Sequence, residues 1–253
     1  MEDAMSQLFY LSTEQLERVK PFFPRSHGIS RVDDLRVLSG IIYVIRYGLQ
    51  WKDAPREYGP YKTLYNRFVR WSRGIFNNIF AELAEAAGND GRLMIDATHL
   101  KAHRSAASPL KKGSFPMYRA HKRRIEFKTP CSSNGNGKPL ALALTAGQVS
   151  NYKGAAILLD SLPEAKELLA DRGYDAVWFR NALLDKGITP CIPSKKNRKQ
   201  PVYYDKNLYR QRHKIEIMFG RLKDWRRIAM RYDRCAHTFF SAICLACAVI
   251  FCS

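Results

Sequence analysis

Acidic residues are scarce in this sequence, and the scarcity is uneven along the chain. The 253 residues include 23 Asp and Glu against 42 Lys and Arg, which gives a net charge of +19. Residues 1–90 hold 12 bases and 11 acids, so residues 91–253 hold the other 30 bases and only 12 acids. A body this basic indicates a polyanionic partner, most commonly nucleic acid, with an anionic membrane surface as the competing interpretation.

Long apolar runs are also missing. No segment reaches the length of a transmembrane helix, and the first residues lack the pattern of a signal peptide, so we expect no membrane partner. The most apolar stretch, residues 239–251, contains Ser241 and is interpreted as a buried final helix. Cys244 and Cys247 form a C-x-x-C in this stretch but have no second ligand pair at zinc spacing, so we expect reduced, buried thiols.

Residues 1–88 are predicted to form a small all-α module. Ser12 followed by Gln15 has the capping-box pattern of a helix start. Gly48 is a natural helix stop, and Thr63 can cap a helix that follows it. After the capped start at Ser12, the expected helices cover residues 32–47, 63–71 and 74–87.

The helix predicted over residues 63–71 is amphipathic and basic. Such a helix within a group of short helices favours a helix-turn-helix-like, DNA-binding module. A packing domain without base contacts is the alternative interpretation. The candidate DNA-contacting residues are Lys62, Asn66, Arg67 and Arg70.

From residue 89 to residue 253 the pattern becomes a mixture of strands and helices. Glycines at 88 and 91 mark the change, and short apolar runs then alternate with helical segments, which predicts an α/β domain. A long basic helix is expected over residues 208–232, and basic loops over 98–112 and 194–199. The expected strands cover residues 92–97, 139–145, 167–170 and 189–193, and the other helices cover 154–162 and 176–186.

Three carboxylates have positions that could converge. Asp96 and Asp171 each follow an apolar strand, and Glu216 is a lone acid in the first half of the long basic helix. Convergent carboxylates repel one another unless they bind divalent cations, and in a nucleic-acid-binding domain that chemistry is two-metal phosphoryl transfer. For each acid a helix cap or an ion pair is the alternative, with Arg212 as the partner of Glu216. Asp171 is preferred to Asp175 because it ends the strand.

The segments MIDATHLKAHRSAA, LLADRGYDAVWF and LYRQRHKIEIMFGRLK carry a family resemblance. Tyr209, Arg212, Glu216 and Lys223 have two, three and six residues between successive members, and with these segments the chain resembles bacterial insertion-sequence transposases of the DDE class, in the insertion-sequence-five family. The resemblance covers most of the chain. It implies an RNase H-like catalytic core over residues 89–253, preceded by a module for DNA-end recognition.

The resemblance also implies a site and partners. Asp96, Asp171 and Glu216 would form the catalytic, metal-binding triad, with two Mg²⁺ or Mn²⁺ ions. DNA-end contact by Tyr209, Arg212 and Lys223 is a hypothesis. The implied partners are double-stranded DNA, as terminal inverted repeats and target, and further copies of the chain in a homodimer or larger assembly. The implied location is the bacterial cytoplasm, in association with the nucleoid.

One segment departs from the family pattern. Relatives carry a strand with a Lys and a His between residues 115 and 133, where this chain has FPMYRAHKRRIEFKTPCSS, and the sequence also ends abruptly at FCS. RRIEFK alternates and could supply a substitute strand. The departure supports an alternative function, in which a catalytically impaired copy acts only as a sequence-specific DNA-binding protein. A nuclease that does not transpose is a third hypothesis.

Overall fold

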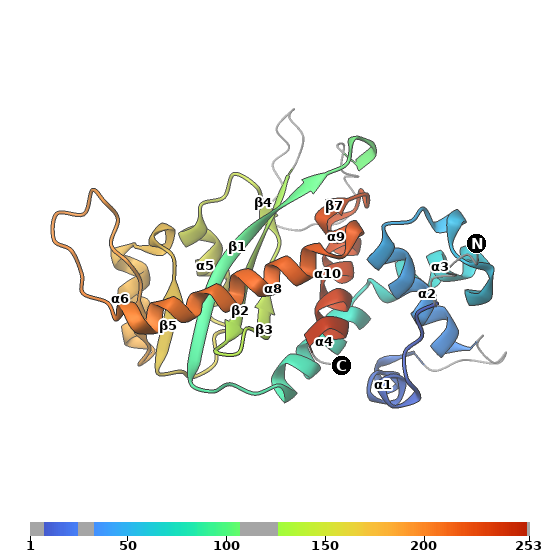
Figure 1. Ribbon diagram of the computed structural model, residues 1–253, viewed down its shortest axis with the longest axis horizontal. Coiled ribbons are helices and arrows are strands. Elements are labelled where there is room, and N and C mark those ends of the chain that lie inside the picture. Colours follow the sequence, from blue (N-terminus) through green and yellow to red (C-terminus); the bar gives the residue numbers. More distant parts are fainter. Residues whose placement is uncertain (1–7, 25–32, 107–125, 252–253) are drawn as a thin grey trace, which may run out of the picture.

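A mixed β-sheet forms the centre of the computed structural model, which describes residues 8–24, 33–106 and 126–251 (Figure 1). The strand order is β3-β2-β1-β5-β6, with β4 paired to β2 and β7 paired to β1. β2 is antiparallel to both β1 and β3, whereas β1, β5 and β6 are parallel. The strands are β1 (Arg92–Ala102), β2 (Phe127–Asn134), β3 (Pro139–Leu142), β4 (Thr145–Ala146), β5 (Glu167–Ala170), β6 (Thr189–Cys191) and β7 (Met230–Arg231).

Helices cover both faces of the sheet. β3, β2 and β1 are antiparallel, and β5 and β6 continue the sheet in parallel with β1. This sheet with helices on both faces confirms the predicted RNase H-like arrangement. Short 3₁₀ turns lie at Lys20–Phe22, Trp51–Asp53, Arg56–Tyr58, Arg104–Ala106, Arg172–Tyr174 and Arg210–Arg212. The α-helices are α1 (Thr13–Val19), α2 (Asp34–Tyr47), α3 (Tyr61–Trp71), α4 (Ile75–Ala86), α5 (Asn151–Leu159), α6 (Val177–Asp185), α7 (Lys206–Tyr209), α8 (His213–Lys223), α9 (Arg226–Ala229) and α10 (Ala236–Phe251).

Side chains of β1 alternate between two hydrophobic cores, one on each face of the sheet. Leu93 and Ile95 belong to the core that includes residues of α5 and α6. Met94 belongs to the larger core that includes residues of α4, α8 and α10. This period of two is expected of a strand that is covered on both faces.

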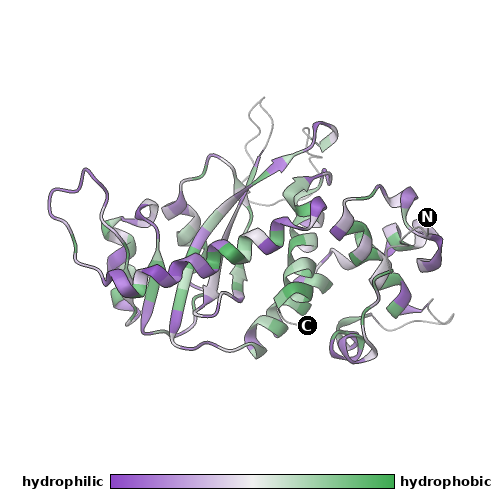
Figure 2. Cartoon of the chain, in the orientation of Figure 1, coloured by the Kyte–Doolittle hydropathy of each residue, from purple (hydrophilic) through white to green (hydrophobic). Residues whose placement is uncertain are grey.

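α10 is buried over most of its length, as predicted for the apolar end of the chain. Figure 2 shows it as hydrophobic nearly all round, and it packs against α4, α2 and α8. An all-round apolar helix is stable in water only when other elements enclose it. No helix in the described segments is long and apolar enough to cross a membrane.

The amino-terminal helices share the larger core with the sheet. α4 packs on α10, and α2 packs on α9. Gly48 ends α2 with a φ of 72°, and a Cβ there would lie 2.7 Å from Cβ of Arg226. Arg227 donates to the carbonyl of Leu49 at 2.9 Å, and its guanidinium lies over the ring of Trp51. The change at residue 88 is therefore a change of secondary structure within one packed body, and a domain boundary there stays a prediction.

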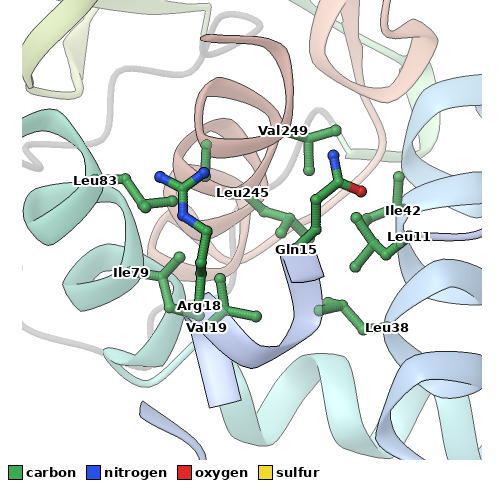
Figure 3. A pocket seen from close by; sticks show the side chains of 11 residues that line it. Leu11, Gln15, Arg18, Val19, Leu38, Ile42, Ile79, Leu83, Leu245 and Val249 are labelled. Atoms are coloured by element: carbon green, nitrogen blue, oxygen red, sulfur yellow. The ribbon is translucent and has the colours of Figure 1, made fainter. Parts of the chain in front are cut away.

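An apolar pocket marks the junction of these helices (Figure 3). Side chains from α1, α2, α4 and α10 converge on it, so helices distant in sequence share one contact region. Gln15 and Arg18 of α1 contribute its polar lining. The apolar lining comes from Leu11, Val19, Leu38, Ile42, Ile79, Leu83, Leu245, Ala248 and Val249.

Several local predictions hold. The capping box of Ser12 and Gln15 is present, and Gly48 is the left-handed C-cap of α2. The helix predicted from residue 32 begins at Asp34 instead, and Asp33 is its N-cap, since its carboxylate accepts hydrogen bonds from the amides of residues 35 and 36. The prediction that Thr63 caps the next helix is wrong, because α3 begins at Tyr61 directly after Pro60.

The long helix predicted over residues 208–232 is interrupted. α7 and a 3₁₀ turn precede α8, and α8 ends at Lys223. Trp225 then adopts an extended conformation and is buried, and Met230 and Arg231 pair with β1 as the short strand β7. Burial of an indole and pairing of a strand are tertiary effects, and they outweigh the local helical pattern.

β1 and β2 also differ from the predicted strands. β1 continues to Ala102, so Asp96 lies within the strand, and residues 98–102 are not the predicted loop. The substitute strand predicted in RRIEFK is present between β1 and β3, but it runs from Phe127 to Asn134. Residues 107–125, which include most of the divergent segment, lie outside the described residues.

β2 is unusually polar for a central strand. Every residue of FKTPCSSN is buried, and Pro130 has no amide hydrogen for the ladder. The hydroxyls of Thr129, Ser132 and Ser133 have no hydrogen-bond partner among the described residues. Buried hydroxyls without partners cost free energy, so the divergent segment leaves the centre of the sheet imperfectly satisfied.

Asp175 anchors the loop that follows β6. Its carboxylate is buried and accepts hydrogen bonds from Arg180 Nε at 2.8 Å, from Arg198 Nη1 at 2.6 Å and from the amide of Lys195 at 2.8 Å. Burial alone would raise the pKa of Asp175, but these three donors outweigh it and lower the pKa. The predicted basic loop over residues 194–199 is therefore tied to α6 through one carboxylate.

Two buried threonines allow a direct test of the β2 description. Replacing Thr129 by Val keeps the shape and removes a hydroxyl without a partner, so the free energy of unfolding should rise by about 1 kcal/mol. Thr145 is also buried, but its hydroxyl donates a hydrogen bond to the carbonyl of Lys128 at 3.2 Å. Thr145→Val should therefore lower the free energy of unfolding by about 1 kcal/mol. Urea denaturation of both variants measures the contrast, and equal effects would contradict it.

The anchor at Asp175 predicts a pH-dependent stability. Asp175→Asn should lower the free energy of unfolding by about 3 kcal/mol at neutral pH, because it leaves the buried guanidinium of Arg180 and the partly buried one of Arg198 without a carboxylate. Since the folded pKa is lowered, the difference should persist above the unfolded pKa of about 3.9 and shrink as pH falls through the folded value. Denaturation at several pH values measures it, with the exposed Asp185→Asn on α6 as control.

Candidate active site

Asp96 and Asp171 are neighbours because of the register between β1 and β5. The last parallel pair is Ile95 with Ala170, and the next residue on each strand is an aspartate. Neighbouring strands lie about 5 Å apart, so the two aspartates lie side by side. The sequence predicted their convergence, although Asp96 lies in the middle of its strand.

Arg212 joins Asp96 to the helix that crosses above it. Its Nη1 lies 3.2 Å from Oδ2 of Asp96, and its Nη2 lies 2.9 Å from Oε1 of Glu216. Its Nε donates to the hydroxyl of Tyr209 at 3.4 Å. The side chains of Arg212 and Asp96 are 12% and 15% exposed, and that of Glu216 is 58% exposed. Arg212 therefore connects Asp96 to two of the other spaced residues, Tyr209 and Glu216, and the ion pair between Arg212 and Glu216 is present.

The carboxylates influence one another electrostatically. Burial raises the pKa of Asp96, the guanidinium of Arg212 and the amide of Ala97 lower it, and the carboxylates of Asp171 and Glu216 raise it further. The net result is a pKa above the usual range of an aspartate. Asp96 thus lies within electrostatic reach of both other predicted acids.

Asp171 is held in a crowded position. Its Oδ1 accepts from the amide of Gly173 at 2.8 Å, in the 3₁₀ turn that follows β5. A Cβ on Gly173 would lie 2.8 Å from that same oxygen and 3.0 Å from Nδ2 of Asn151. Only a glycine leaves room for the carboxylate and the α5 amide together.

Lys128 is a member of this site that the sequence prediction missed. It is buried on β2, and its ammonium donates to Oδ1 of Asn151 and, at 3.3 Å, to the carbonyl of Val149. Burial lowers the pKa of Lys128, and the carboxylates of Asp171 and Asp96 raise it. The sequence signal for this role was the presence of a lysine in β2, where every residue is buried.

The donor set has the chemistry of a divalent metal site. Carboxylate oxygens are the ligands that Mg²⁺ and Mn²⁺ prefer, and mutually repelling carboxylates are stabilised by such ions. In the described part of the chain, however, no three carboxylate, imidazole or thiol groups are grouped closely enough to hold an ion. The guanidinium of Arg212 lies between two of the acids, so it supplies the positive charge in this arrangement.

The amino-terminal candidates for DNA contact separate into two groups. Lys62, Asn66 and Arg70 are exposed on α3. Arg67 is buried, pairs with Asp34 at 2.6 Å and lies over the ring of Trp71. The prediction that Arg67 contacts DNA is therefore wrong, because its guanidinium belongs to the interior of the module.

Other residues singled out in the sequence lie apart from the carboxylates. Lys223 is exposed at the end of α8, and no hydrogen bond reaches it from the described residues. His99 is exposed on β1, whereas His103 stacks on Tyr232.

Two family models match the chain. The model described as "Putative transposase of IS4/5 family" matches residues 11–80, and the model described as "Transposase DDE domain" matches residues 88–251. The second match alone takes in more than half of the chain. DDE transposases cleave DNA and transfer the cut ends, and they use divalent metal ions.

Curated relatives agree with these models. The chain is 34% identical over 116 residues to a "Putative transposase for insertion sequence element IS6501" of Brucella ovis, covering 45% of this chain and 88% of that protein. It is 30% identical over 129 residues to a "Putative transposase for insertion sequence element IS402" of Burkholderia cepacia, covering 47% of this chain and 59% of the relative.

A solved structure resembles the chain more distantly. The piggyBac transposase in a synaptic complex with hairpin DNA aligns over 93% of this chain and 69% of its own, at 8% identity and a TM-score of 0.47, which is too distant to bear on function. The family matches and the curated relatives decide the assignment. The chain belongs to the DDE transposases of bacterial insertion sequences.

Proposed function

We propose that this chain cleaves DNA at the terminal inverted repeats of its own element and joins the cut ends to target DNA, with Asp96, Asp171 and Glu216 as its catalytic acids. One observation carries the proposal. The register of β1 and β5 brings Asp96 beside Asp171, and Arg212 links Asp96 to Glu216 on α8. Two of the three acids thereby contact the same guanidinium, and the third acid lies beside Asp96 on the neighbouring strand.

The proposed cofactor is a pair of Mg²⁺ or Mn²⁺ ions, held by the three acids. Bound ions would supply an activated nucleophile and would offset the charge on the leaving oxygen. The chain itself orients the ligands: the amide of Gly173 fixes one oxygen of Asp171, and the amide of Ala97 donates to Oδ1 of Asp96. Lys128 adds a buried positive charge beside both aspartates.

Arg212 has two roles in this proposal. In the metal-free protein its guanidinium offsets the repulsion between Asp96 and Glu216. With metal ions bound to the acids, the guanidinium of Arg212 would be available to a DNA phosphate, for which its planar shape is well suited. Tyr209 limits how far it moves, because its ring and hydroxyl contact the guanidinium.

DNA is the proposed partner of the basic surface. Residues 91–253 carry 30 bases against 12 acids, and phosphate contacts by Lys and Arg supply most of the affinity of such proteins for DNA. On α3 the exposed Lys62, Asn66 and Arg70 are the proposed contacts to the repeat, and Lys223 on α8 is a further phosphate contact. Because an element has two ends, we propose that two copies act together.

A second candidate function is DNA binding without cleavage. The observation that favours it is β2, where three buried hydroxyls have no partner among the described residues and Pro130 occupies a central position. A poorly satisfied strand beside β1 would loosen the position of Asp96. Such a copy would still occupy the repeats.

The acids are tested by cleavage of a duplex that carries the repeats flanking this gene. Asp96→Asn, Asp171→Asn and Glu216→Gln should each lower the rate by more than about 100-fold, since even the outer partners of metal ligands contribute roughly 10- to 100-fold. Glu167→Gln is the control, because this β5 carboxylate pairs with Arg92. Equal cleavage by an acid variant removes that acid from the site. Salt-sensitive binding without cleavage by the unaltered protein would favour the binding-only function.

The role of Arg212 is tested by metal binding in the absence of DNA. Arg212→Gln removes the competing cation, so Mn²⁺ should bind roughly tenfold more tightly, equivalent to about 1.4 kcal/mol. Isothermal titration calorimetry measures the affinity. Arg221→Gln, an exposed change of the same charge on α8, is the control and should leave it unaltered. Weaker binding in Arg212→Gln alone would show that this guanidinium positions the acids instead of competing with the ion.

A further inference from the structure

Gly220 in α8 is exposed, and the packing of the described residues does not require a glycine there. The described α-helices contain three glycines, which are Gly40, Gly154 and Gly220. A Cβ on Gly40 would lie 2.6 Å from Cβ of Tyr58. A Cβ on Gly154 would lie 2.9 Å from Cγ of Pro130, so both of these glycines are needed for packing. Outside the local helix backbone, a Cβ on Gly220 would meet no described atom within 4 Å.

The glycine at position 220 lowers the stability of the helix that contains it. A glycine within a helix is unfavourable relative to alanine, because it loses more backbone freedom on folding. Gly220 does not end the helix, since α8 continues to Lys223. The open space at this position therefore costs stability without improving the packing of the described residues. Close approach of another molecule to the backbone is a known reason for such a glycine.

Gly220 lies on the stripe of α8 that carries a proposed catalytic acid. Glu216, Gly220 and Lys223 follow one another at steps of four and three residues, so they share one face of the helix. All three residues are exposed. α8 contacts β1 and crosses the sheet on the side nearest the viewer in Figure 1. A molecule that reaches Glu216 along this face of the helix therefore passes over Gly220.

The charge of this segment indicates that the other molecule is a polyanion. Residues 210–223 hold five bases and one acid, and that acid, Glu216, is paired with Arg212. The exposed Arg221 and Lys223 flank Gly220. A second copy of the same helix would bring like charges together, which is unfavourable, whereas a DNA backbone offers phosphates to both side chains.

We propose that the sugar–phosphate backbone of the bound DNA lies against α8 at Gly220, in the space that a side chain would otherwise fill. Lys223 and Arg221 bind phosphates on either side of this contact. Gly220 acts on the reaction only through the depth at which the strand reaches the acids, so it is a positioning residue. The inference rests on the proposed function for the identity of the ligand, and it adds where the strand touches the protein.

The test compares stability with DNA binding. Gly220→Ala should raise Tm by about 2–4 °C, because alanine favours the helix and its methyl group meets no described atom beyond the local backbone. Gly220→Leu should fold, but it should weaken binding of the duplex that carries the repeats by roughly tenfold, through lost phosphate contacts. Fluorescence anisotropy without divalent metal measures the affinity. Ala81→Leu is the matched control, since it places the same side chain at an exposed position of α4.

The salt dependence of binding reports the loss of phosphate contacts directly. The slope of log K against log[salt] decreases in magnitude by about one for each contact that is lost. Gly220→Leu should therefore decrease the slope by about one or more, because the leucine holds the DNA backbone away from Lys223 and Arg221. Lys223→Gln should decrease the slope in the unaltered chain and have little further effect in Gly220→Leu. A glycine with a purely structural role would leave the slope unchanged.

The outcomes are distinguishable from those of the cleavage experiment. Equal affinity and equal slope in Gly220→Leu and Ala81→Leu would overturn the close approach, whatever the acid variants do. A lower Tm in Gly220→Ala would show that the glycine serves the fold, and the proposal would be wrong. It would also be wrong if Gly220→Leu changed self-association in sedimentation while duplex binding was unaltered. Weaker binding by Gly220→Leu would support the close approach even if the unaltered chain did not cleave.

Discussion

The parallel pairing of β1 with β5 is the constraint on which the rest of the structure depends. Leu93 and Ile95 face one core and Met94 the other, so the register cannot slip by one residue without exchanging the two apolar sets. The position of the acids thus follows from hydrophobic burial. The same strand also pairs with β2 and β7, and therefore every part of the sheet takes its place from β1.

Charge balance is the second determinant of the site. Carboxylates at a half-buried position destabilise one another, and a folded metal-free protein needs a cation close by. Arg212 supplies it from the 3₁₀ turn before α8, and Lys128 supplies it from β2. The guanidinium lies between Asp96 and Glu216, whereas the ammonium is bound by Asn151 and the carbonyl of Val149. These two cations offset the charge of the acids in the metal-free protein.

Local patterns predicted much of this, and contacts between distant residues account for what they missed. Apolar runs that end on an acid located Asp96 and Asp171, and residue spacing located the pair of Arg212 with Glu216. The break of the long helix depends on burial of Trp225, which no local pattern reports. From the sequence, the side chain of Arg67 could face solvent or pair with Asp34, and only the packing of the helices decides between the two.

The core shared by the amino-terminal helices and the sheet has a mechanical consequence. α4 packs on α10 and α2 on α9, so α3, the helix proposed to contact DNA, is separated from the acids by packed side chains and not by a flexible linker. This packing keeps the distance between α3 and the acids constant. If α3 binds the repeat, the number of base pairs between the bound sequence and the cut bond would be set by the protein interior, and substitutions in that interior would alter where the element is cut.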